Sequence, residues 1–375
     1  MSLGNKFKDK RVFLTGHTGF KGSWLSHWLL QLGAEVHGFA LDPKPEDVLF
    51  DQLNLSRRLA SDTRADIADQ ISLQLAIDST RPDFVFHLAA QPLVRLSYEI
   101  PVETFATNVM GTAHALDALR MAEKRGTLTS PCIAIVVTTD KCYENREWLH
   151  AYREEDAMGG FDPYSASKGC AELVVSAYRR SFFENNSLIR LASARAGNVI
   201  GGGDWAKDRI IPDCFRALQR GDAIQVRNKT STRPWQHVLE PLSGYLWLAA
   251  RLCDTPTSAE NQSSELQSGF NFGPLLQSNR TVADVVSALL KHAPGKWSDC
   301  SDPNAKHEAG KLNLAIDKAY HLLGWKPVWD FERTIEETAC WYTDVLAGAN
   351  AEALTSEQIA LYCKDAAQSN IDWAR

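Results

Sequence analysis

The chain has 375 residues, of which 44% are hydrophobic and 23% charged, and its formal net charge is −6. These values are ordinary for a globular protein, and the length suits two domains or one large domain with an elaborated second lobe. The chain has no block of Lys and Arg, so we expect neither nucleic acid nor an anionic membrane as a partner.

The start of the chain shows no targeting pattern. The basic stretch Lys6–Arg11 leads into an apolar run that is too short for a signal-peptide core, and no apolar run approaches the roughly 20 residues of a membrane span. The eight cysteines form no CxxC motif and no His/Cys cluster at metal spacing. We therefore expect reduced thiols, a cytoplasmic location and no metal.

The N-terminal half alternates short apolar runs with helical segments. Strands that are apolar on both faces and separated by helices indicate an α/β fold with a parallel, doubly wound sheet of the Rossmann type. The predicted strands are Val12–Thr15, Glu35–Ala40, Phe84–Leu88, Ile133–Val137 and one near Ser187–Arg195. The predicted helices include Trp24–Leu32, Pro101–Lys124 and Tyr164–Phe183.

The second half is less regular. Pro256–Ser268, rich in Ser, Glu and Gln, is typical of a surface loop. Three helical segments follow it, and from Ala349 onward the sequence predicts no particular element. The three helices are Thr281–His292, Ile316–Leu323 and Glu332–Leu346.

A glycine-rich stretch, TGHTGFKG, follows the first strand and opens a helix. Gly16 permits the tight turn, Gly19 lets the backbone approach a pyrophosphate, and Gly22 allows the helix to pack closely on the strand. The helix N-terminus then faces the anion with free N–H groups. Asp42 follows the second strand, where an acid binds the adenosine ribose and repels a 2′-phosphate, so the pattern favours NAD over NADP.

The motif YSASK places Tyr164 and Lys168 at i and i+4, on one face of a helix. A tyrosine with a pKa of about 10 is a poor base at neutral pH. A nearby ammonium and a nicotinamide ring would stabilise the phenolate, so that it accepts the proton of a sugar hydroxyl. Thr138 or Thr139, at the end of the fourth strand, is the expected hydroxyl partner.

The spacing GxxGxxG, with ADIAD, HLAAQ and TNVMGT downstream, resembles the extended short-chain dehydrogenase/reductase superfamily. The resemblance implies an enzyme that binds NAD, with Asp66 and Ile67 flanking the adenine and Leu88 to Ala90 lying along the cofactor. The implied NAD contacts are Gly16, Thr18, Gly19, Phe20, Gly22, Asp42, Asp66, Ile67, Leu88, Ala89, Ala90, Asn108, Tyr164 and Lys168.

Five segments in order resemble the CDP-glucose 4,6-dehydratases: TGHTGFKGSWL, AAQPLVR, TTDKCYEN, RAGNVIGGGDW and RPWQHV. The resemblance implies a hydro-lyase that oxidises C4 of CDP-D-glucose, eliminates water across C5 and C6, and returns hydride to C6. The product, CDP-4-dehydro-6-deoxy-D-glucose, would feed deoxysugars of bacterial lipopolysaccharide O-antigen. The implied catalytic residues are Thr139, Asp140, Lys141, Tyr164 and Lys168.

Lys141 stands where the dTDP-glucose 4,6-dehydratases carry a glutamate base. We expect Asp140 to protonate the departing C6 hydroxyl and Lys141 to remove the C5 proton, which requires burial and cationic neighbours to lower its pKa. Two alternatives remain open: Lys141 positions the substrate, or it is solvated at the end of the strand. The two side chains would be inert if they formed a plain ion pair.

The segments after the last strand match the substrate-binding part of these enzymes. The resemblance implies that Arg233 pairs with the diphosphate, as guanidinium groups do, that Asn198 also meets the diphosphate, and that Arg209 lies near the nucleotide. Arg95 is a further candidate near the sugar, and Trp205 and Trp235 either line the substrate pocket or pack in the core. The expected substrate contacts are Gln91, Asn198, Arg209 and Arg233.

The chain is expected to divide into two parts. Residues 1–194 with 235–256 form the NAD-binding domain, and residues 195–234 with 257–375 form a smaller α/β lobe that binds the sugar nucleotide. In members of the superfamily the helices matching Pro101–Lys124 and Tyr164–Phe183 build a dimer, so we expect a homodimer or tetramer.

Three other functions remain open. A sugar-nucleotide 4-epimerase also oxidises C4, but the Asp140–Lys141 pair argues against it. A 4,6-dehydratase acting on UDP- or dTDP-glucose is an alternative, because the base preference cannot be read from these residues. A dinucleotide-binding protein without catalysis is disfavoured, since Tyr164 and Lys168 are both present.

Overall fold

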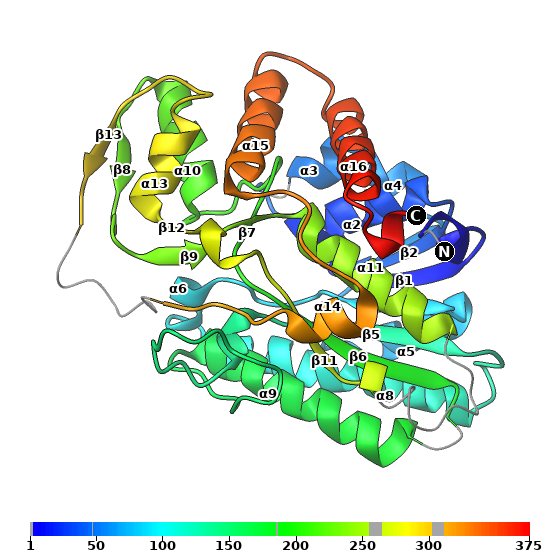
Figure 1. Ribbon diagram of the computed structural model, residues 1–375. Helices are drawn as coiled ribbons and strands as arrows, with labels where there is room; N and C mark the ends of the chain where they lie inside the picture. Colours follow the sequence, from blue (N-terminus) through cyan, green and yellow to red (C-terminus); the bar gives the residue numbers. More distant parts are fainter. Residues whose placement is uncertain (1–2, 47, 185–186, 255–264, 302–310) are drawn as a thin grey trace.

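The computed structural model describes residues 3–46, 48–184, 187–254, 265–301 and 311–375. Its centre is a seven-stranded sheet in the order β11-β6-β5-β4-β1-β2-β3, in which all neighbouring strands run parallel (Figure 1). The predicted doubly wound α/β fold is confirmed. The strands are β1 (Arg11–Thr15), β2 (Glu35–Ala40), β3 (Ser61–Arg64), β4 (Phe84–His87), β5 (Cys132–Val137), β6 (Ile189–Ala196) and β11 (Gly269–Phe272).

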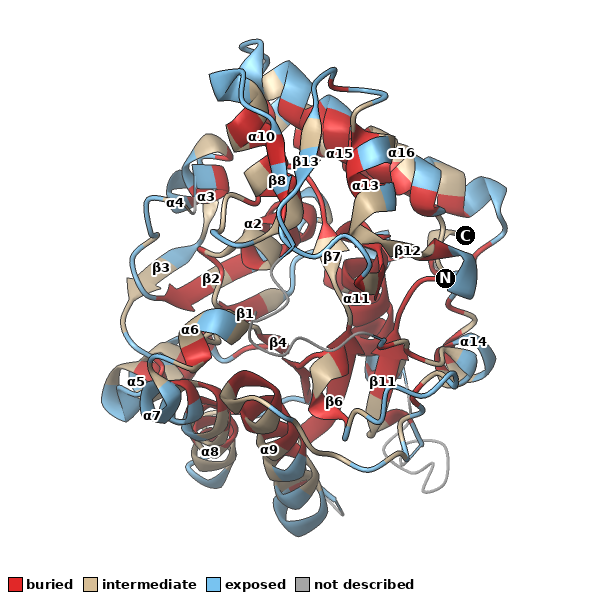
Figure 2. Ribbon diagram, turned by 90° about the vertical axis from the view of Figure 1, so that its left-hand side faces the viewer, coloured by how far each residue is buried: buried red, intermediate tan, exposed pale blue. Residues whose placement is uncertain are grey.

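Helices cover both faces of the sheet, so the strand interiors are buried (Figure 2). Successive residues of a strand point to opposite faces. Phe13 accordingly packs in the core beneath one helical layer, whereas Val12 and Leu14 pack in the core on the other side. One layer holds α5 (Gln70–Thr80), α8 (Gly111–Lys124) and α9 (Pro163–Tyr178), and the other holds α2 (Phe20–Gln31), α11 (Leu239–Asp254) and α16 (Ala351–Gln368).

Three small two-stranded sheets lie beyond the carboxyl ends of the long strands, together with several helices (Figure 1). They are the pairs β7 (Val199–Ile200) with β10 (Gln236–His237), β8 (Ile224–Val226) with β13 (Trp297–Asp299), and β9 (Thr232–Pro234) with β12 (Asn279–Thr281). The helices around them are α10 (Ile210–Arg220), α13 (Val282–Leu289) and α15 (Phe331–Leu346), whereas α14 (Asp317–Leu323) packs against β11 and α11.

Short helices complete the described part of the chain. They include two five-residue π-helical turns, η1 and η3, which interrupt or end the long helices expected from the sequence. The α-helices are α1 (Gly4–Phe7), α3 (Val48–Gln52), α4 (Leu55–Arg58), α6 (Val94–Ser97) and α7 (Pro101–Phe105). The others are η1 (Ala106–Met110), η2 (Asp140–Cys142), η3 (Arg179–Phe183), η4 (Leu276–Ser278) and η5 (Asp372–Ala374).

The elements that the sequence did not predict include two strands of the large sheet, β3 and β11, and the helix α16. Of the predicted loop Pro256–Ser268, residues 256–264 lie outside the described residues. The predicted division into two parts stays a prediction, although β11 belongs to the large sheet and α16 packs against α2. None of the described helices is long and apolar enough to cross a membrane.

Candidate active site at the carboxyl end of the sheet

The loops after β1, β4, β5 and β6 meet at the carboxyl edge of the sheet, where ligands bind in open α/β folds. The glycine loop after β1 is shaped for close backbone approach. Gly16 has a φ of +74°, and a Cβ there would lie 2.7 Å from the amide nitrogen of Ala89. A Cβ on Gly22 would lie 2.1 Å from the Gly16 carbonyl oxygen. Gly19 is the N-cap of α2 and provides no side-chain cap, so the first amides of α2 face outward from the loop.

The remaining predicted cofactor residues line the same edge. Thr18 donates to the carbonyl of Leu41, which fixes the glycine loop to the end of β2. The hydroxyl of Thr15 accepts the amides of Leu88 and Ala89, each at 3.1 Å, and so holds the loop after β4 against β1. Phe20 and Ala90 are half-buried, Ile67 is buried, and Asp42 and Asp66 are exposed.

Asn108 lies in the π-helical turn η1 and joins two parts of the site. Its amide donates to Ser167 Oγ at 2.8 Å and to the Gln91 carbonyl at 3.1 Å, while its Oδ1 accepts the Gln91 amide at 2.8 Å. π-Helical turns often occur at functional sites because they reorient one side chain of a helix. Here the turn connects the loop after β4 to α9, the helix of Tyr164 and Lys168.

Tyr164 and Lys168 are buried in the first turns of α9, which is capped by Asp162. Lys168 Nζ donates to the carbonyl of Val137 at the end of β5, at 3.3 Å. Burial raises the pKa of Tyr164 to about 12, with a smaller lowering effect from a hydrogen bond with Thr139. Burial lowers the pKa of Lys168 to about 8. Burial therefore outweighs the lowering by neighbouring groups, and the predicted fall of this pKa depends in addition on the charge of a bound nicotinamide.

The structure distinguishes the two candidate threonines. The hydroxyl of Thr138 donates to the carboxylate of Glu172, so its proton is already engaged in a hydrogen bond. Thr139 faces Tyr164 and also donates to Asp140 Oδ1 at 3.0 Å. Thr139 is thus the threonine that lies beside the phenol.

Asp140 and Lys141 begin the short helix η2 directly after β5. Lys141 Nζ lies 3.6 Å from Asp140 Oδ1 and 3.4 Å from Asn198 Oδ1. The Lys141 side chain is 22% exposed and that of Asp140 is fully buried, so this lysine is largely shielded from solvent at the strand end. The geometry brings Asp140, Lys141 and the predicted substrate residue Asn198 together.

Lys21 is a further cation of this site that we did not assign a function from the sequence. It occupies the first turn of α2, and its pKa is lowered to about 7 by burial and then by the charge of Arg209, with Lys168 and Lys141 adding smaller effects. The carboxylate of Asp140 acts in the opposite direction. The sequence signal that could have indicated Lys21 was its position in the GFKG motif, just past the first two glycines of the loop.

A buried polar network that the sequence analysis missed lies beneath the predicted catalytic residues. The Glu172 carboxylate accepts from Thr138, from Ser193 Oγ at 2.7 Å and from Arg195 Nη2 at 2.9 Å. Arg195 in turn donates to Tyr143 OH at 2.6 Å. Two sequence signals could have indicated this network: Glu172 follows Lys168 by four residues, and Arg195 is a charged residue inside an apolar strand.

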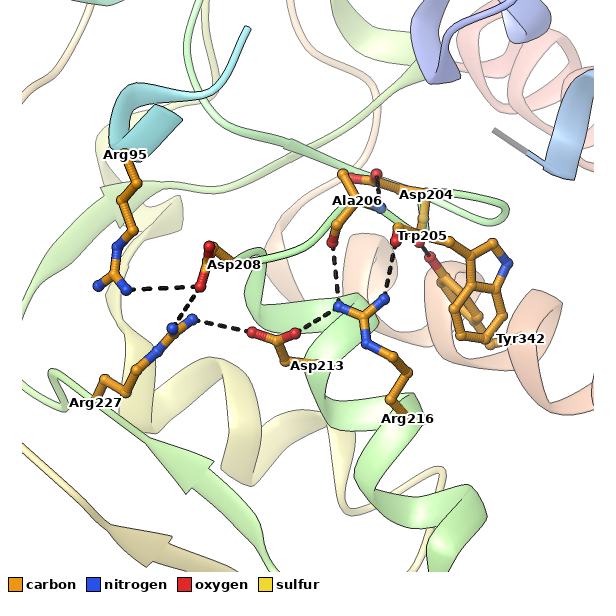
Figure 3. A network of polar contacts seen from close by, with 9 residues as sticks. All are labelled: Arg95, Asp204, Trp205, Ala206, Asp208, Asp213, Arg216, Arg227 and Tyr342. Atoms are coloured by element: carbon orange, nitrogen blue, oxygen red, sulfur yellow. Dashed lines mark hydrogen bonds and ion pairs between the residues drawn. The ribbon is translucent and has the colours of Figure 1, made fainter. Parts of the chain in front are cut away.

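Arg209 pairs with Asp204, and a network of polar contacts holds the loop between these two residues (Figure 3). Arg209 Nη1 lies 2.7 Å from Asp204 Oδ2, and Asp204 begins the loop that ends at Arg209. Arg216 of α10 donates to the Trp205 carbonyl at 2.8 Å and the Ala206 carbonyl at 3.2 Å, which fixes the middle of this loop.

The same network of polar contacts extends to Arg95 in α6 (Figure 3). Asp213 pairs with Arg216 and, at 3.1 Å, with Arg227. Arg227 pairs with Asp208, and Asp208 also lies 3.6 Å from Arg95 Nη1 in α6. The predicted sugar-side residue Arg95 is thereby connected to the loop of Arg209.

The other predicted substrate residues have definite surroundings. Arg233 is buried in β9, opposite Arg280 of β12. The Gln91 amide group is engaged with Leu93 and Thr104, so it shapes its own loop. Both tryptophans pack internally: Trp205 lies edge-on to Tyr342, and Trp235 donates to the Arg280 carbonyl.

His17 of the glycine loop forms a further unpredicted contact. Its Nε2 lies 2.8 Å from Asp62 Oδ1 in β3, and Asp62 pairs with Arg64 at 2.7 Å. Gly38 leaves room for the imidazole, because a Cβ there would lie 2.5 Å from His17 Nε2. Among the described residues, no three His, Cys, Asp or Glu side chains gather in a way that could hold a metal ion.

A family model and a known relative, both named as 4,6-dehydratases, each match most of the chain. Residues 13–338 match the family model described as GDP-mannose 4,6 dehydratase. The chain is 45% identical to the CDP-glucose 4,6-dehydratase of Salmonella typhimurium over 367 residues, covering 96% of this chain and 97% of that one.

Solved structures show the same fold at low identity. The UDP-glucose 4-epimerase of Thermotoga maritima, solved with UDP-glucose, has a TM-score of 0.73 and 20% identity, with 89% of this chain and 99% of that chain covered. The dTDP-glucose 4,6-dehydratase of Bacillus anthracis, solved in complex with NAD, has a TM-score of 0.71 and 19% identity, with 90% and 97% covered.

Proposed function

The chain belongs to the GDP-mannose 4,6-dehydratase family, and we propose that it removes water from CDP-D-glucose to give CDP-4-dehydro-6-deoxy-D-glucose, with NAD as its cofactor. The proposal rests on one observation above all: Asp140 and Lys141 lie 3.6 Å apart at the end of β5, the strand end that Lys168 of the Tyr164 helix contacts. The substrate is supported by the 45% identical CDP-glucose 4,6-dehydratase, which matches nearly the whole chain.

The glycine loop fits a dinucleotide. Gly16 and Gly22 leave a cradle that a Cβ would fill, and α2 begins beside it without a side-chain cap. Asp42 would bind the adenosine ribose, Asp66 and Ile67 would flank the adenine, and Leu88 to Ala90 would lie along the cofactor. When bound, the nicotinamide supplies the hydride acceptor for C4 and the hydride donor for C6.

The chain's own residues supply the proton transfers. Tyr164 accepts the proton of the C4 hydroxyl, with Lys168 as the neighbouring ammonium and Thr139 as the hydrogen-bond partner of the sugar oxygen. Oxidation at C4 acidifies the C5 hydrogen. Lys141 in its neutral form removes that proton, and Asp140 in its acid form protonates the C6 hydroxyl, which departs as water.

The 3.6 Å separation of Asp140 and Lys141 suits this pairing of roles, because a proton placed on either group is within reach of the other. Asn198 accepts from Lys141 and would orient it while also meeting the diphosphate. Arg209 and Arg233 would pair with the phosphates, and Gln91 would hold the loop beside the sugar.

A panel of nucleotide sugars tests the proposal. Purified protein with NAD is incubated with CDP-, UDP- and dTDP-glucose and with GDP-mannose, and the products are examined by mass spectrometry. Loss of one water from CDP-glucose is the expected result. Conversion without a change of mass would indicate a 4-epimerase, and preferential dehydration of another nucleotide sugar would overturn the CDP assignment.

A homodimer or tetramer, and a cytoplasmic location, are also part of this proposal. α7, η1, α9 and η3 carry large apolar side chains that are exposed in the single chain, and α7 and α8 each pack against α9. A second copy would cover them. These side chains are Val102, Phe105, Met110, Leu173 and Phe182. Light scattering of the wild type and of Leu173→Glu would test the assembly, since the charge should shift it towards monomer.

A further inference from the structure

α9 carries three polar side chains at intervals of four residues, namely Tyr164, Lys168 and Glu172. Glu172 follows Lys168 by four residues, so both lie on one face of the helix. The Glu172 side chain is 4% exposed, and its carboxylate accepts from Thr138, Ser193 and Arg195. A buried carboxylate with a guanidinium and two hydroxyl donors is held in its ionised form.

Glu172 and Lys168 hold consecutive residues at the end of β5. Lys168 donates to the carbonyl of Val137, and Glu172 accepts from the side chain of Thr138. The next residue is Thr139, which faces the phenol of Tyr164. Any rotation of this strand end would move Thr139 and the two residues that follow it, so the pair fixes the geometry of the whole catalytic segment.

Glu172 is also the anion that faces Lys168. The other titratable groups that act on or feel Lys168 are Cys142 of η2, His87 of β4 and Lys21 of α2. Burial raises the pKa of the Cys142 thiol well above its usual value and lowers the pKa of His87 to about 3, so both are neutral at neutral pH. Within the described part of the chain, these contacts leave Glu172 as the negative partner of the Lys168 ammonium.

We infer that Glu172 is a positioning residue of the proposed reaction: it fixes the end of β5 that carries Thr139 and keeps Lys168 protonated beside Tyr164. The inference rests on the proposed function only in naming the step that Lys168 serves. Its structural content, that the charge of Glu172 raises the pKa of Lys168, can be measured without turnover.

The substitution Glu172→Gln tests the inference, because it removes the anion and leaves Arg195 without its partner. Loss of the Glu172 charge favours the neutral form of Lys168. The pKa of Lys168 should therefore fall, by about one unit for the loss of a neighbouring opposite charge. The basic limb of the pH dependence of CDP-glucose dehydration should move to lower pH by a similar amount.

A second variant guards against misfolding, since an unpaired buried Arg195 is destabilising. Glu172→Gln combined with Arg195→Gln replaces the ion pair by two neutral amides. The Lys168 pKa should still fall, because Glu172 acts on it directly and Arg195 does not. The matched control is Glu123→Gln, a carboxylate that accepts from Leu188 and Ser187 at the opposite end of β6.

Two readouts are needed. The Lys168 pKa is followed by NMR titration of 13C-labelled lysine, assigned with Lys168→Arg, and the pH profile of dehydration is recorded for each folded variant. A lowered Lys168 pKa and a shifted basic limb in the Gln variants, with neither change in Glu123→Gln, is the expected result. An unchanged Lys168 pKa in the folded double variant would overturn the inference. A wild type that does not dehydrate CDP-glucose would instead refute the proposed function and leave the titration result standing.

Discussion

Lys141 Nζ lies 3.6 Å from Asp140 Oδ1, whereas Asp140 Oδ2 is buried and finds no hydrogen-bond partner among the described residues. A buried carboxylate oxygen without a partner is costly, and the cost falls when that oxygen is protonated or meets a substrate donor. This asymmetry favours Asp140 as a proton donor to a group that reaches Oδ2. It argues against a plain ion pair, in which Lys141 would satisfy the carboxylate.

Replacing Lys141 by Ala should leave oxidation at C4 intact and reduce elimination, because the base for the C5 proton is gone. We expect a loss of about 10²- to 10⁴-fold, the usual contribution of a general base. Exchange of the C5 hydrogen with deuterium from solvent should be lost in parallel, as measured by mass spectrometry. Lys141→Glu, which restores a base of another type, should recover part of the rate. Near-normal elimination in the Ala variant would end this assignment.

Replacing Tyr164 by Phe should abolish oxidation at C4 while NAD still binds, because the phenol that accepts the hydroxyl proton is removed. The expected loss is about 10²- to 10⁴-fold in turnover. Tyr178→Phe is the matched control, since Tyr178 is on the same helix and packs against Phe182 and Phe183 away from the site. Equal losses in the two variants would show that the effect comes from helix packing.

Replacing Gly22 by Ala should weaken NAD binding and lower stability, because the new Cβ would lie 2.1 Å from the Gly16 carbonyl oxygen. Overpacking of this kind typically costs about 1–3 kcal/mol. Gly126→Ala controls for a loss of stability away from the glycine loop: a Cβ there meets nothing within 4 Å, but the φ of +71° strains an alanine. Calorimetry with NAD should show a large loss of affinity for the first variant and none for the second.

Replacing Asp213 by Asn should raise the KM for the nucleotide sugar a few-fold and leave kcat nearly unchanged. Asp213 joins Arg216 and Arg227, which hold the loop ahead of Arg209. A looser loop weakens ground-state binding without touching the reacting atoms. Asp222→Asn, which breaks only the exposed pair with Arg220, should change neither parameter. A fall in kcat with constant KM would contradict the proposal that this network of ion pairs positions Arg209.

Stability should depend on pH through Glu240, at the start of α11. Burial raises the pKa of Glu240 to about 7, despite donors from Trp329, Tyr362 and Val328. The folded protein therefore holds a proton that the unfolded chain releases at about pH 4.3, so stability is present below that pH and is lost as the pH rises to about 7.

The difference across this window corresponds to about 3 kcal/mol for a buried group with such a shift. Glu240→Gln should flatten it, which denaturant unfolding at pH 5 and pH 7 would reveal as a smaller difference than in the wild type. An equal pH dependence in both proteins would show that Glu240 is ionised throughout.

The sequence predicted most of the sheet because its strands are apolar on both faces. β3 escaped notice since Ser61–Arg64 is polar and only half-buried at the sheet edge. α16 was missed because its buried residues, such as Ile359 and Tyr362, are interspersed with Ala, Thr and Gln, which weakens the apolar pattern.

The site was predictable where residues next to one another in sequence act together, as in Thr139 to Lys141 and in the Tyr164–Lys168 pair. It was not predictable where partners are brought together only by folding. Glu172 and Arg195 come from different elements, and no local pattern indicates that they meet. The contact between Arg95 and Asp208 likewise depends on how α6 and the loop before α10 are placed.

The burial of α2 has a consequence for how ionic strength should affect the enzyme. Residues Gly22 to Leu29 are all buried, and α11 and α16 pack against this helix, so little water surrounds its peptide dipoles. Mobile ions screen a field mainly through solvent. The attraction of the α2 N-terminus for an anion should therefore persist in concentrated salt, in contrast to the exposed arginine pairs at the rim of the site.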